Sequence, residues 1–418
     1  MNHRIISNFL SLGLLQGVNC LVPVLVIPFI VRALGVEAFG NVTYAQGIVQ
    51  YFTILVNYGF DYSATRQIAI HRDDKACLSS IFWSVISAKL ILLIIAFCLF
   101  CILTSCYGRM SQDPMLYFSL FVINLGYLFF PTWFFQGMER MGTIALLNFF
   151  VKVLGLGIPV LLVSAPEDYL IYAAMPSVAY LLMGIVAFFY AIRVGEIQRP
   201  DLNALKPARD EQFRLGFPVF LNTLFASLYT LANLTILGLF NENYEVGIYS
   251  GAYKIISAIM MVSSMPIHMA IFPSISQKMA ESFSSGWRYY KRMIGVVFLF
   301  AVVVSLLTYL LAPWMVEILL GDKFIDSIPL LRVMSVIPAL VIIASMFTVQ
   351  GLYGLGFQRY APLVGLTVGL ACVALNFWWI PRLGGTGAAY AWIVAEVLEI
   401  LISGFIVWHC IRKEESLS

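Results

Sequence analysis

The sequence predicts an all-α membrane protein with about twelve transmembrane helices arranged as two six-helix bundles. Of its 418 residues, 61% are hydrophobic and 11% are charged, whereas roughly 25% are charged in a soluble domain. Apolar stretches of roughly 20 residues follow one another, and a helix of this length crosses the ~30 Å hydrocarbon core of a bilayer. Barrel strands would instead alternate apolar and polar residues. We expect helices, because backbone groups in lipid must be hydrogen-bonded internally.

The apolar stretches form two sets of six, separated by the most polar part of the chain. We expect a first bundle over residues 1–192, a cytoplasmic linker over 193–213 and a second bundle over 214–418. The twelve predicted spans are 7–33, 39–60, 78–104, 115–137, 143–164 and 169–192, then 214–240, 246–273, 292–312, 328–354, 361–380 and 386–410.

The basic residues predict how the chain is oriented in the membrane. With the N-terminus inside, 17 of the 25 Lys and Arg residues fall in inward segments and 4 fall outside. Cytoplasmic loops carry such an excess of basic residues, so we expect both termini in the cytoplasm. Arg66 and Arg72 lie in the predicted inward loop after the second span, where they can contact lipid headgroups. The net charge of +3 reflects this topology and predicts no nucleic-acid partner.

A weak internal repeat supports the division into two halves. FGNVTYAQGI (39–48) aligns with VGIYSGAYKI (246–255), which places Gly40 on Gly247. The offset is close to half the chain length. Since each half holds an even number of spans, the halves have the same orientation in the membrane. The repeat therefore predicts two bundles related by a pseudo-two-fold axis along the membrane normal.

Four cations and two anions lie within predicted spans: Lys89, Lys152, Lys254, Arg332, Glu396 and Glu399. Charged side chains in membrane helices usually face a wet cavity or a partner. Each half contributes two of the cations, so a cavity between the bundles would suit an anionic, phosphate-bearing solute. Structural ion pairs are the alternative for the three lysines. Arg332 lies near a span end, where its long side chain could instead reach the membrane surface.

Other polar residues in the spans extend this interpretation. Glu396 and Glu399 are three residues apart and share a helix face, so they could neutralise a lysine or bind the coupling cation of an antiporter. Tyr44, Gln46 and Asn57 in one span, and Asn222 and Asn233 in another, are residue types that bind sugars. Hydrogen bonding between helices explains such residues equally well.

The sequence offers little for catalysis or metal binding. Cys98 and Cys101 form a CxxC pair, but it lies inside a lipid-length apolar run, where small buried side chains are expected. The four histidines are scattered. We therefore expect neither an enzyme nor a cofactor.

Four stretches resemble the Wzx-type O-antigen flippases, the polysaccharide transporter branch of the multidrug/oligosaccharidyl-lipid/polysaccharide exporter superfamily. They are NFLSLGLLQGVNCLVPVLVIPFIVRALGVEAFGNVTYAQ (8–46), YGFDYSATRQIAIHRDD (58–74), WFFQGMERM (133–141) and VGIYSGAYKI (246–255). The resemblance covers the whole chain.

This resemblance implies a flippase in the bacterial inner membrane that works by alternating access. The implied substrate is an undecaprenyl-diphosphate-linked oligosaccharide repeat unit, moved from the cytoplasmic to the periplasmic leaflet. The implied driving force is antiport of protons or sodium, and the implied partners include the O-antigen polymerase and chain-length proteins. A multidrug antiporter is the nearest alternative, but it would favour a carboxylate-lined cavity. An O-antigen polymerase or ligase would need a large periplasmic loop, whereas the longest outward loops here are 105–114 and 313–327.

Overall fold

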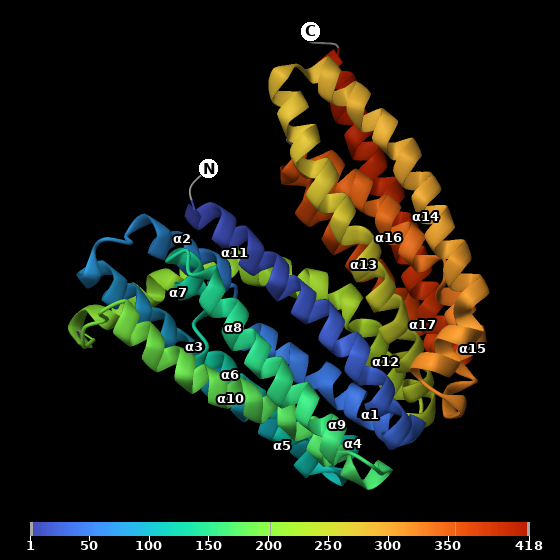
Figure 1. Cartoon of the computed structure of the whole chain (residues 1–418), viewed down its shortest axis with the longest axis horizontal. Coiled ribbons are helices and arrows are strands. Elements are labelled where there is room, and N and C mark those ends of the chain that lie inside the picture. The colour runs from blue at the N-terminus through green and yellow to red at the C-terminus, as the bar shows by residue number, and fades with distance from the viewer. Residues whose placement is uncertain (1–2, 201, 356, 416–418) are drawn as a thin grey trace. The chain divides into compact units, whose positions relative to one another are not determined.

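The computed structural model describes residues 3–200, 202–355 and 357–415, which are almost wholly helical and contain no strand (Figure 1). They divide into two compact units, Met1–Leu34 with Val42–Leu224 and Gly35–Asn41 with Phe225–Ser418. The boundary at Leu224 lies inside a helix, and the short segment Gly35–Asn41 belongs with the later part of the chain. The predicted all-α fold is confirmed.

The helices before the 196–201 segment are α1 (His3–Asn57), α2 (Phe60–Ile70), α3 (Lys75–Cys106), α4 (Gly108–Gln112), α5 (Pro114–Phe121), α6 (Ile123–Phe129), α7 (Thr132–Gly137), α8 (Met141–Lys152), the π-helix η1 (Val153–Gly157), α9 (Ile158–Leu162), the 3₁₀ turn η2 (Pro166–Asp168) and α10 (Tyr169–Val194). Those after it are α11 (Leu202–Thr230), α12 (Ala232–Phe240), α13 (Asn243–Glu281), α14 (Phe283–Leu319), the 3₁₀ turn η3 (Asp322–Phe324), α15 (Ser327–Met334), α16 (Ile337–Ser345), the π-helix η4 (Met346–Tyr353), the 3₁₀ turn η5 (Gln358–Tyr360) and α17 (Ala361–Glu415).

Two of the longest helices each turn at a glycine. α1 breaks at Gly35, whose φ is +71°, and α17 breaks at Gly384, whose φ is +55°. Only glycine adopts positive φ without strain, so these residues separate predicted spans 7–33 from 39–60 and 361–380 from 386–410. Nine segments of the described chain are long and apolar enough to cross a membrane, and one of them, Ala361–Arg412, has the 52 residues needed for two crossings.

In the first unit, α10 packs against α5, α6 and α8. A Cβ on Gly126 would lie 2.7 Å from the carbonyl carbon of Tyr180, and one on Gly184 would lie 2.6 Å from the oxygen of Gly126. These glycines therefore let α6 and α10 approach closely, as small residues do in membrane helix pairs.

In the second unit, α13, α14, α16 and α17 surround a core that includes Ile275, Ile342 and Val368. The glycines aligned by the internal repeat meet in this unit. A Cβ on Gly40 would lie 2.1 Å from the backbone oxygen of Asn243, and one on Gly247 would lie 2.1 Å from that of Val36. The start of α13 and residues 36–40 are thus in backbone contact, which only glycine allows.

Candidate functional site

Lys89 of α3 is 1% exposed and sits inside the first unit. Its Nζ donates to the side-chain oxygen of Asn57 at 3.1 Å and to the backbone oxygen of Tyr127 at 3.2 Å. Tyr127 precedes Pro131 by four residues, and proline has no N–H to offer that oxygen. Tyr127 is also in the last turn of α6, where the helix dipole favours a cation. These neutral partners accommodate the ammonium without an ion pair, so the geometry favours a structural role over cavity lining.

Lys152 has different surroundings. It is the last residue of α8, half-buried, and directly precedes the π-helix η1. In the part of the chain that the structure describes, its ammonium has no hydrogen-bond or ion-pair partner. Single π turns are frequent at functional sites. Lys152 therefore fits a ligand-binding cation better than Lys89 does.

Tyr44 and Gln46 lie in the second half of α1, in the first unit. Tyr44 is fully buried, its hydroxyl is 3.0 Å from that of Tyr107, and the Arg109 guanidinium lies 4.2 Å from its ring centroid. The half-buried Gln46 side chain is hydrogen-bonded to Tyr172. Both predicted sugar-binding residues thus have protein partners in this structure.

The stretch 60–74 forms α2 and the turn after it. Ala64 and Ile68 are fully buried on one helix face, as their spacing predicts. The Thr65 hydroxyl donates to the backbone oxygen of Trp133 at 3.1 Å, and Arg72 pairs with Glu139 at 3.0 Å.

Two of the stretches that carry the family resemblance, 58–74 and 133–141, are therefore packed together. Arg66 is exposed and can reach a headgroup, whereas Arg72 already has a carboxylate partner. The headgroup role predicted for both arginines stays a prediction.

In the second unit, Glu396 is 3% exposed and accepts a hydrogen bond from Trp392 Nε1 at 2.9 Å. Glu399 is half-buried one turn further along α17. No Lys, Arg or His of the described chain lies within ion-pair distance of either carboxylate. A buried carboxylate without a counter-ion is unfavourable, so a bound cation or a proton would stabilise this site.

A buried polar cluster joins α12 to α17 in the same unit. Asn376 Nδ2 donates to Asn233 Oδ1 at 2.6 Å, and the Cys372 thiol lies 3.5 Å from the same oxygen. Asn233 was recognisable from the sequence as a polar residue in a span. Its partners were not, because nothing in the sequence aligns α12 with α17.

The remaining predicted residues are more exposed. Lys254 is half-buried, with its Nζ 5.8 Å from the centroid of Phe39. Arg332 is exposed and stacks over Tyr309 at 5.5 Å, as expected for a side chain that reaches outward from a span end. Asn222 is exposed on α11. Within the described ranges, no group of three or more His, Cys, Asp or Glu side chains could hold a metal ion.

Comparison with protein-family models identifies the family to which this helical chain belongs. Residues 5–279 match the model described as "Polysaccharide biosynthesis protein". The chain belongs to this family. The match covers most of the chain, and it includes all four stretches on which the resemblance to the Wzx-type flippases rests, which is thereby confirmed.

Relatives of this member of the polysaccharide biosynthesis family cover nearly its whole length. A "Putative O-antigen transporter" from Escherichia coli (strain K12) is 28% identical over 391 residues, 94% of each chain. A protein of the same description from Shigella dysenteriae is 26% identical and covers 94% of this chain and 98% of its own.

Solved structures share the fold. A lipid II flippase MurJ structure, in an inward closed conformation, superposes with a TM-score of 0.75 at 12% identity, covering 96% of this chain and 87% of that one. An inward-facing multidrug resistance MATE family transporter gives 0.65 at 17% identity, with 97% and 99% covered. At such identities the likeness concerns the fold alone, and it confirms the predicted two-lobe helical membrane fold.

Proposed function

We propose that this protein flips undecaprenyl-diphosphate-linked O-antigen repeat units from the cytoplasmic to the periplasmic leaflet. The observation that carries the proposal is the similarity, over 94% of the chain, to proteins described as O-antigen transporters, within a family of polysaccharide biosynthesis. The MurJ structure, described as a lipid II flippase, is consistent with the proposal at the level of the fold.

Lys152 is the residue that we assign to the diphosphate, because it is half-buried and its ammonium has no hydrogen-bond or ion-pair partner in the described chain. Lys254 of α13, also half-buried, is a separate candidate for contact with the substrate. Ammonium groups bind phosphate oxygens by charge-assisted hydrogen bonds. Arg332, Tyr44, Gln46 and Asn222 are further candidates for contact with the sugars or with the lipid during the transport cycle.

Glu396 is our candidate for coupling transport to an ion gradient. Its carboxylate is almost fully buried, lies beside Glu399 on the same helix face and has a neutral partner only. Binding of a proton or sodium ion would remove the desolvation penalty of the carboxylate. We infer alternating access with cation antiport, with the basic ends of the helices and both termini in the cytoplasm.

The experiment that tests the proposal is complementation of a strain that lacks its own O-antigen flippase but makes a defined repeat unit. We expect the wild-type gene to restore surface O-antigen. In the empty-vector strain, lipid-linked repeat units should accumulate on the cytoplasmic leaflet. Export of cationic dyes without restored O-antigen would point instead to a multidrug antiporter. O-antigen made without any requirement for this gene would contradict the proposal.

A further inference from the structure

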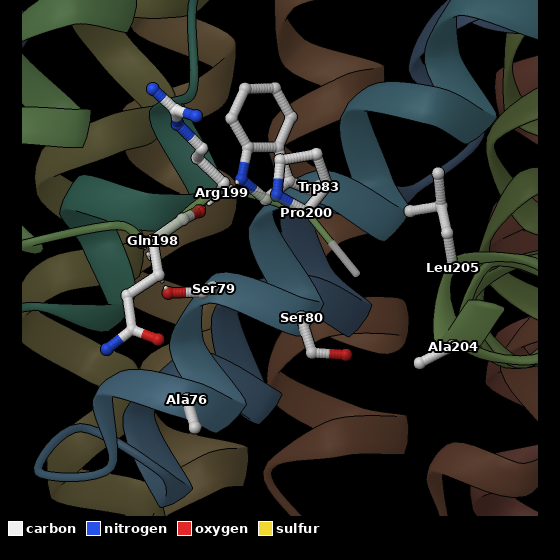
Figure 2. A pocket seen from close by; sticks show the side chains of 9 residues that line it. All are labelled: Ala76, Ser79, Ser80, Trp83, Gln198, Arg199, Pro200, Ala204 and Leu205. Atoms are coloured by element: carbon white, nitrogen blue, oxygen red, sulfur yellow. Dashed lines mark hydrogen bonds between the residues drawn. The ribbon is translucent and has the colours of Figure 1, made fainter. Parts of the chain in front are cut away.

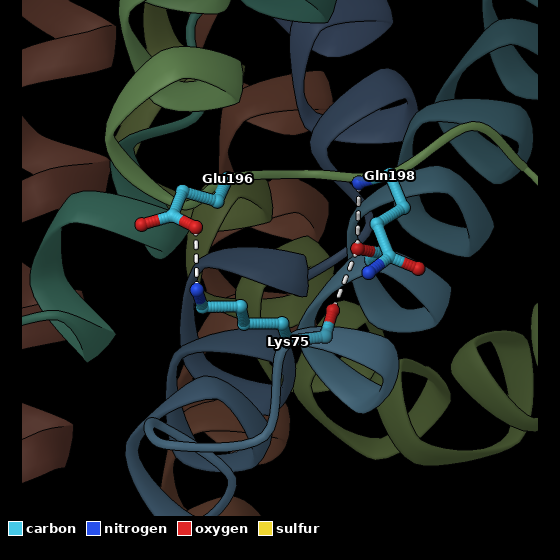
Figure 3. Close-up of polar contacts among 4 residues, drawn as sticks. Lys75, Glu196 and Gln198 are labelled. Atoms are coloured by element: carbon cyan, nitrogen blue, oxygen red, sulfur yellow. Dashed lines mark hydrogen bonds and ion pairs between the residues drawn. The ribbon is translucent and has the colours of Figure 1, made fainter.

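The segment that follows α10 is fastened to the start of α3. The Glu196 carboxylate accepts a hydrogen bond from Lys75 Nζ, and the backbone N–H of Gln198 donates to Ser79 Oγ at 2.9 Å (Figure 3). The indole N–H of Trp83 donates to the backbone oxygen of Gln198 at 2.7 Å. These contacts hold residues 196–198 against one side of α3.

A cavity of about 260 Å³ lies between the first turns of α3 and this segment (Figure 2). Trp83, Pro200 and Leu205 give it apolar walls, and Ser80 and Arg199 stand at its polar side. Ligand pockets usually measure about 300–1,000 Å³. The cavity is slightly smaller than this range, so it can hold a headgroup phosphate and the first carbons of a chain but not an oligosaccharide repeat unit.

Some polar groups around the cavity already have hydrogen-bond partners within the protein, and others have none in the described chain. The hydroxyl of Ser79 and the indole N–H of Trp83 are taken up by the contacts with Gln198. Ser80 and Arg199 are exposed, and neither side chain has a hydrogen-bond or ion-pair partner in the part of the chain that the structure describes. Among the residues that the structure describes, no carboxylate lines the cavity.

The guanidinium of Arg199 points away from Ser80 and Leu205 in Figure 2. It can turn over the opening without breaking a contact, because its stem is flexible and the side chain is exposed. The free groups are thus a hydrogen-bonding hydroxyl and a cation, which together select an anion.

The position of the cavity indicates where such an anion comes from. α3 begins one membrane-crossing segment at Lys75, and Trp83 lies eight residues further, roughly 12 Å at 1.5 Å per residue. Tryptophan concentrates at the level of lipid headgroups. We therefore expect the cavity to open near the layer of lipid phosphates.

We propose that this cavity binds an anionic glycerophospholipid that is separate from the transported substrate. The headgroup phosphate contacts Arg199 and Ser80, and the start of an acyl chain follows Trp83, Pro200 and Leu205. Because it contacts both sides of the cavity, the lipid holds Arg199, Pro200 and Leu205 against α3 while the chain transports.

Native mass spectrometry of the full-length protein tests this proposal. The protein is purified from membranes and exposed to phosphatidylglycerol or phosphatidylethanolamine. We expect the wild type to retain phosphatidylglycerol preferentially, and both Arg199→Gln and Leu205→Trp to retain about tenfold less, as the loss of one charge-assisted contact or of the space predicts. Arg193→Gln is the matched control, because Arg193 is an exposed arginine of α10 that does not line the cavity; it should behave as the wild type.

Equal retention of the two lipids, or unchanged retention by Arg199→Gln, would overturn the proposal. Thermal protection by inorganic phosphate that depends on Arg199 would also overturn it, since the site would then take a free anion. The melting temperature of each variant without lipid shows whether the variant is folded. If Leu205→Trp does not fold, the retention of phosphatidylglycerol by Arg199→Gln alone tests the proposal. The measurement needs no transport, so its failure is distinguishable from failure of the proposed flippase function.

Discussion

The two lysines of the first unit show how the same residue type serves different purposes in a membrane helix. Lys89 is enclosed and donates to Asn57 and to the backbone oxygen of Tyr127. Lys152 is half-buried and has no partner in the described chain. An isolated charge in the hydrocarbon region costs about 2.5–3.5 kcal/mol on insertion scales. At Lys89 protein acceptors offset this cost, whereas at Lys152 the offset has to come from water or a ligand.

Replacing Lys89 should destabilise the fold. Lys89→Met fills a similar volume but leaves the acceptors of Asn57 and Tyr127 buried without a donor, at about 1–3 kcal/mol for each group. We expect a clearly lower melting temperature for the purified variant and a lower protein level in membranes. A melting temperature equal to that of the wild type would contradict the structural role.

Replacing Lys152 should affect transport and leave stability alone. Lys152→Met removes a cation that has no hydrogen-bond or ion-pair partner within the described chain, so the free energy of unfolding should stay within about 0.5 kcal/mol of the wild type. Surface O-antigen in the complemented strain should fall at an unchanged protein level. If O-antigen were unaffected, Lys152 would have no part in binding the diphosphate.

Part of this difference between Lys89 and Lys152 can be predicted from the sequence. The long apolar runs show that Lys89 and Lys152 lie in membrane helices, and Pro131 shows that the oxygen of Tyr127 lacks a backbone donor. Nothing in the sequence shows that Lys89 is the residue that reaches this oxygen, because the contact depends on how α3 packs against α6. The Trp392–Glu396 bond, by contrast, joins residues four apart on one helix and could have been predicted.

At the level of elements, backbone contact at glycines sets how closely helices approach. Gly40 and Gly247 stand out, since they occupy equivalent places in the internal repeat and also meet in the second unit. Association of helices in lipid depends on such close packing, because lipid tails are as apolar as leucine side chains. The repeat identified these glycines, but it did not indicate that they touch.

A methyl group at this contact should loosen the second unit. In Gly40→Ala the new Cβ would stand 2.1 Å from the oxygen of Asn243, so the backbones must separate, at a cost of about 1–3 kcal/mol. Gly295→Ala in α14 is the matched control, because nothing lies within 4 Å of its Cβ position and alanine favours helix by about 0.5–1 kcal/mol. The melting temperature should decrease for Gly40→Ala and should not decrease for Gly295→Ala. Equal effects would contradict the close-approach argument.

The predicted spans match the positions of the observed helices, which hydropathy determines. They do not predict the π-helices or the polar contacts within those helices. The turns at Gly35 and Gly384 fall where the sequence predicts short loops. The π-helices Val153–Gly157 and Met346–Tyr353 were not predicted, because the same apolar residues suit an α-helix and only tertiary packing selects the wider turn. The polar cluster of Asn233, Cys372 and Asn376 was missed as a cluster for the same reason.

At the scale of the whole molecule, the proposed cation antiport would link substrate movement to an ion gradient. Glu396 supplies a buried acidic group for this link, in the unit that does not contain Lys152. Coupling between two such sites needs states in which each ligand has a different affinity. The central requirement is therefore that removing the carboxylate abolishes the response to the gradient while leaving the fold intact.

Glu396→Gln tests the link between gradient and transport. The amide oxygen can still accept the bond from Trp392, so the local structure should persist while the charge is lost. In proteoliposomes we expect flipping by this variant to be insensitive to an imposed proton or sodium gradient. Glu281→Gln, which changes an exposed carboxylate at the end of α13, should respond to the gradient as the wild type does. A response retained by Glu396→Gln would rule out this residue as the coupling site.

The most direct test of the proposed function is a flipping assay with the purified protein in proteoliposomes. Undecaprenyl-diphosphate-linked oligosaccharide is incorporated, and its exposure in the outer leaflet is followed with a membrane-impermeant lectin or glycosidase. We predict that lipid-linked sugar inside becomes accessible within the assay time only when the protein is present, and that Lys152→Met slows this exposure. Accessibility at the same rate in protein-free vesicles and in vesicles with the folded protein would contradict the proposed function.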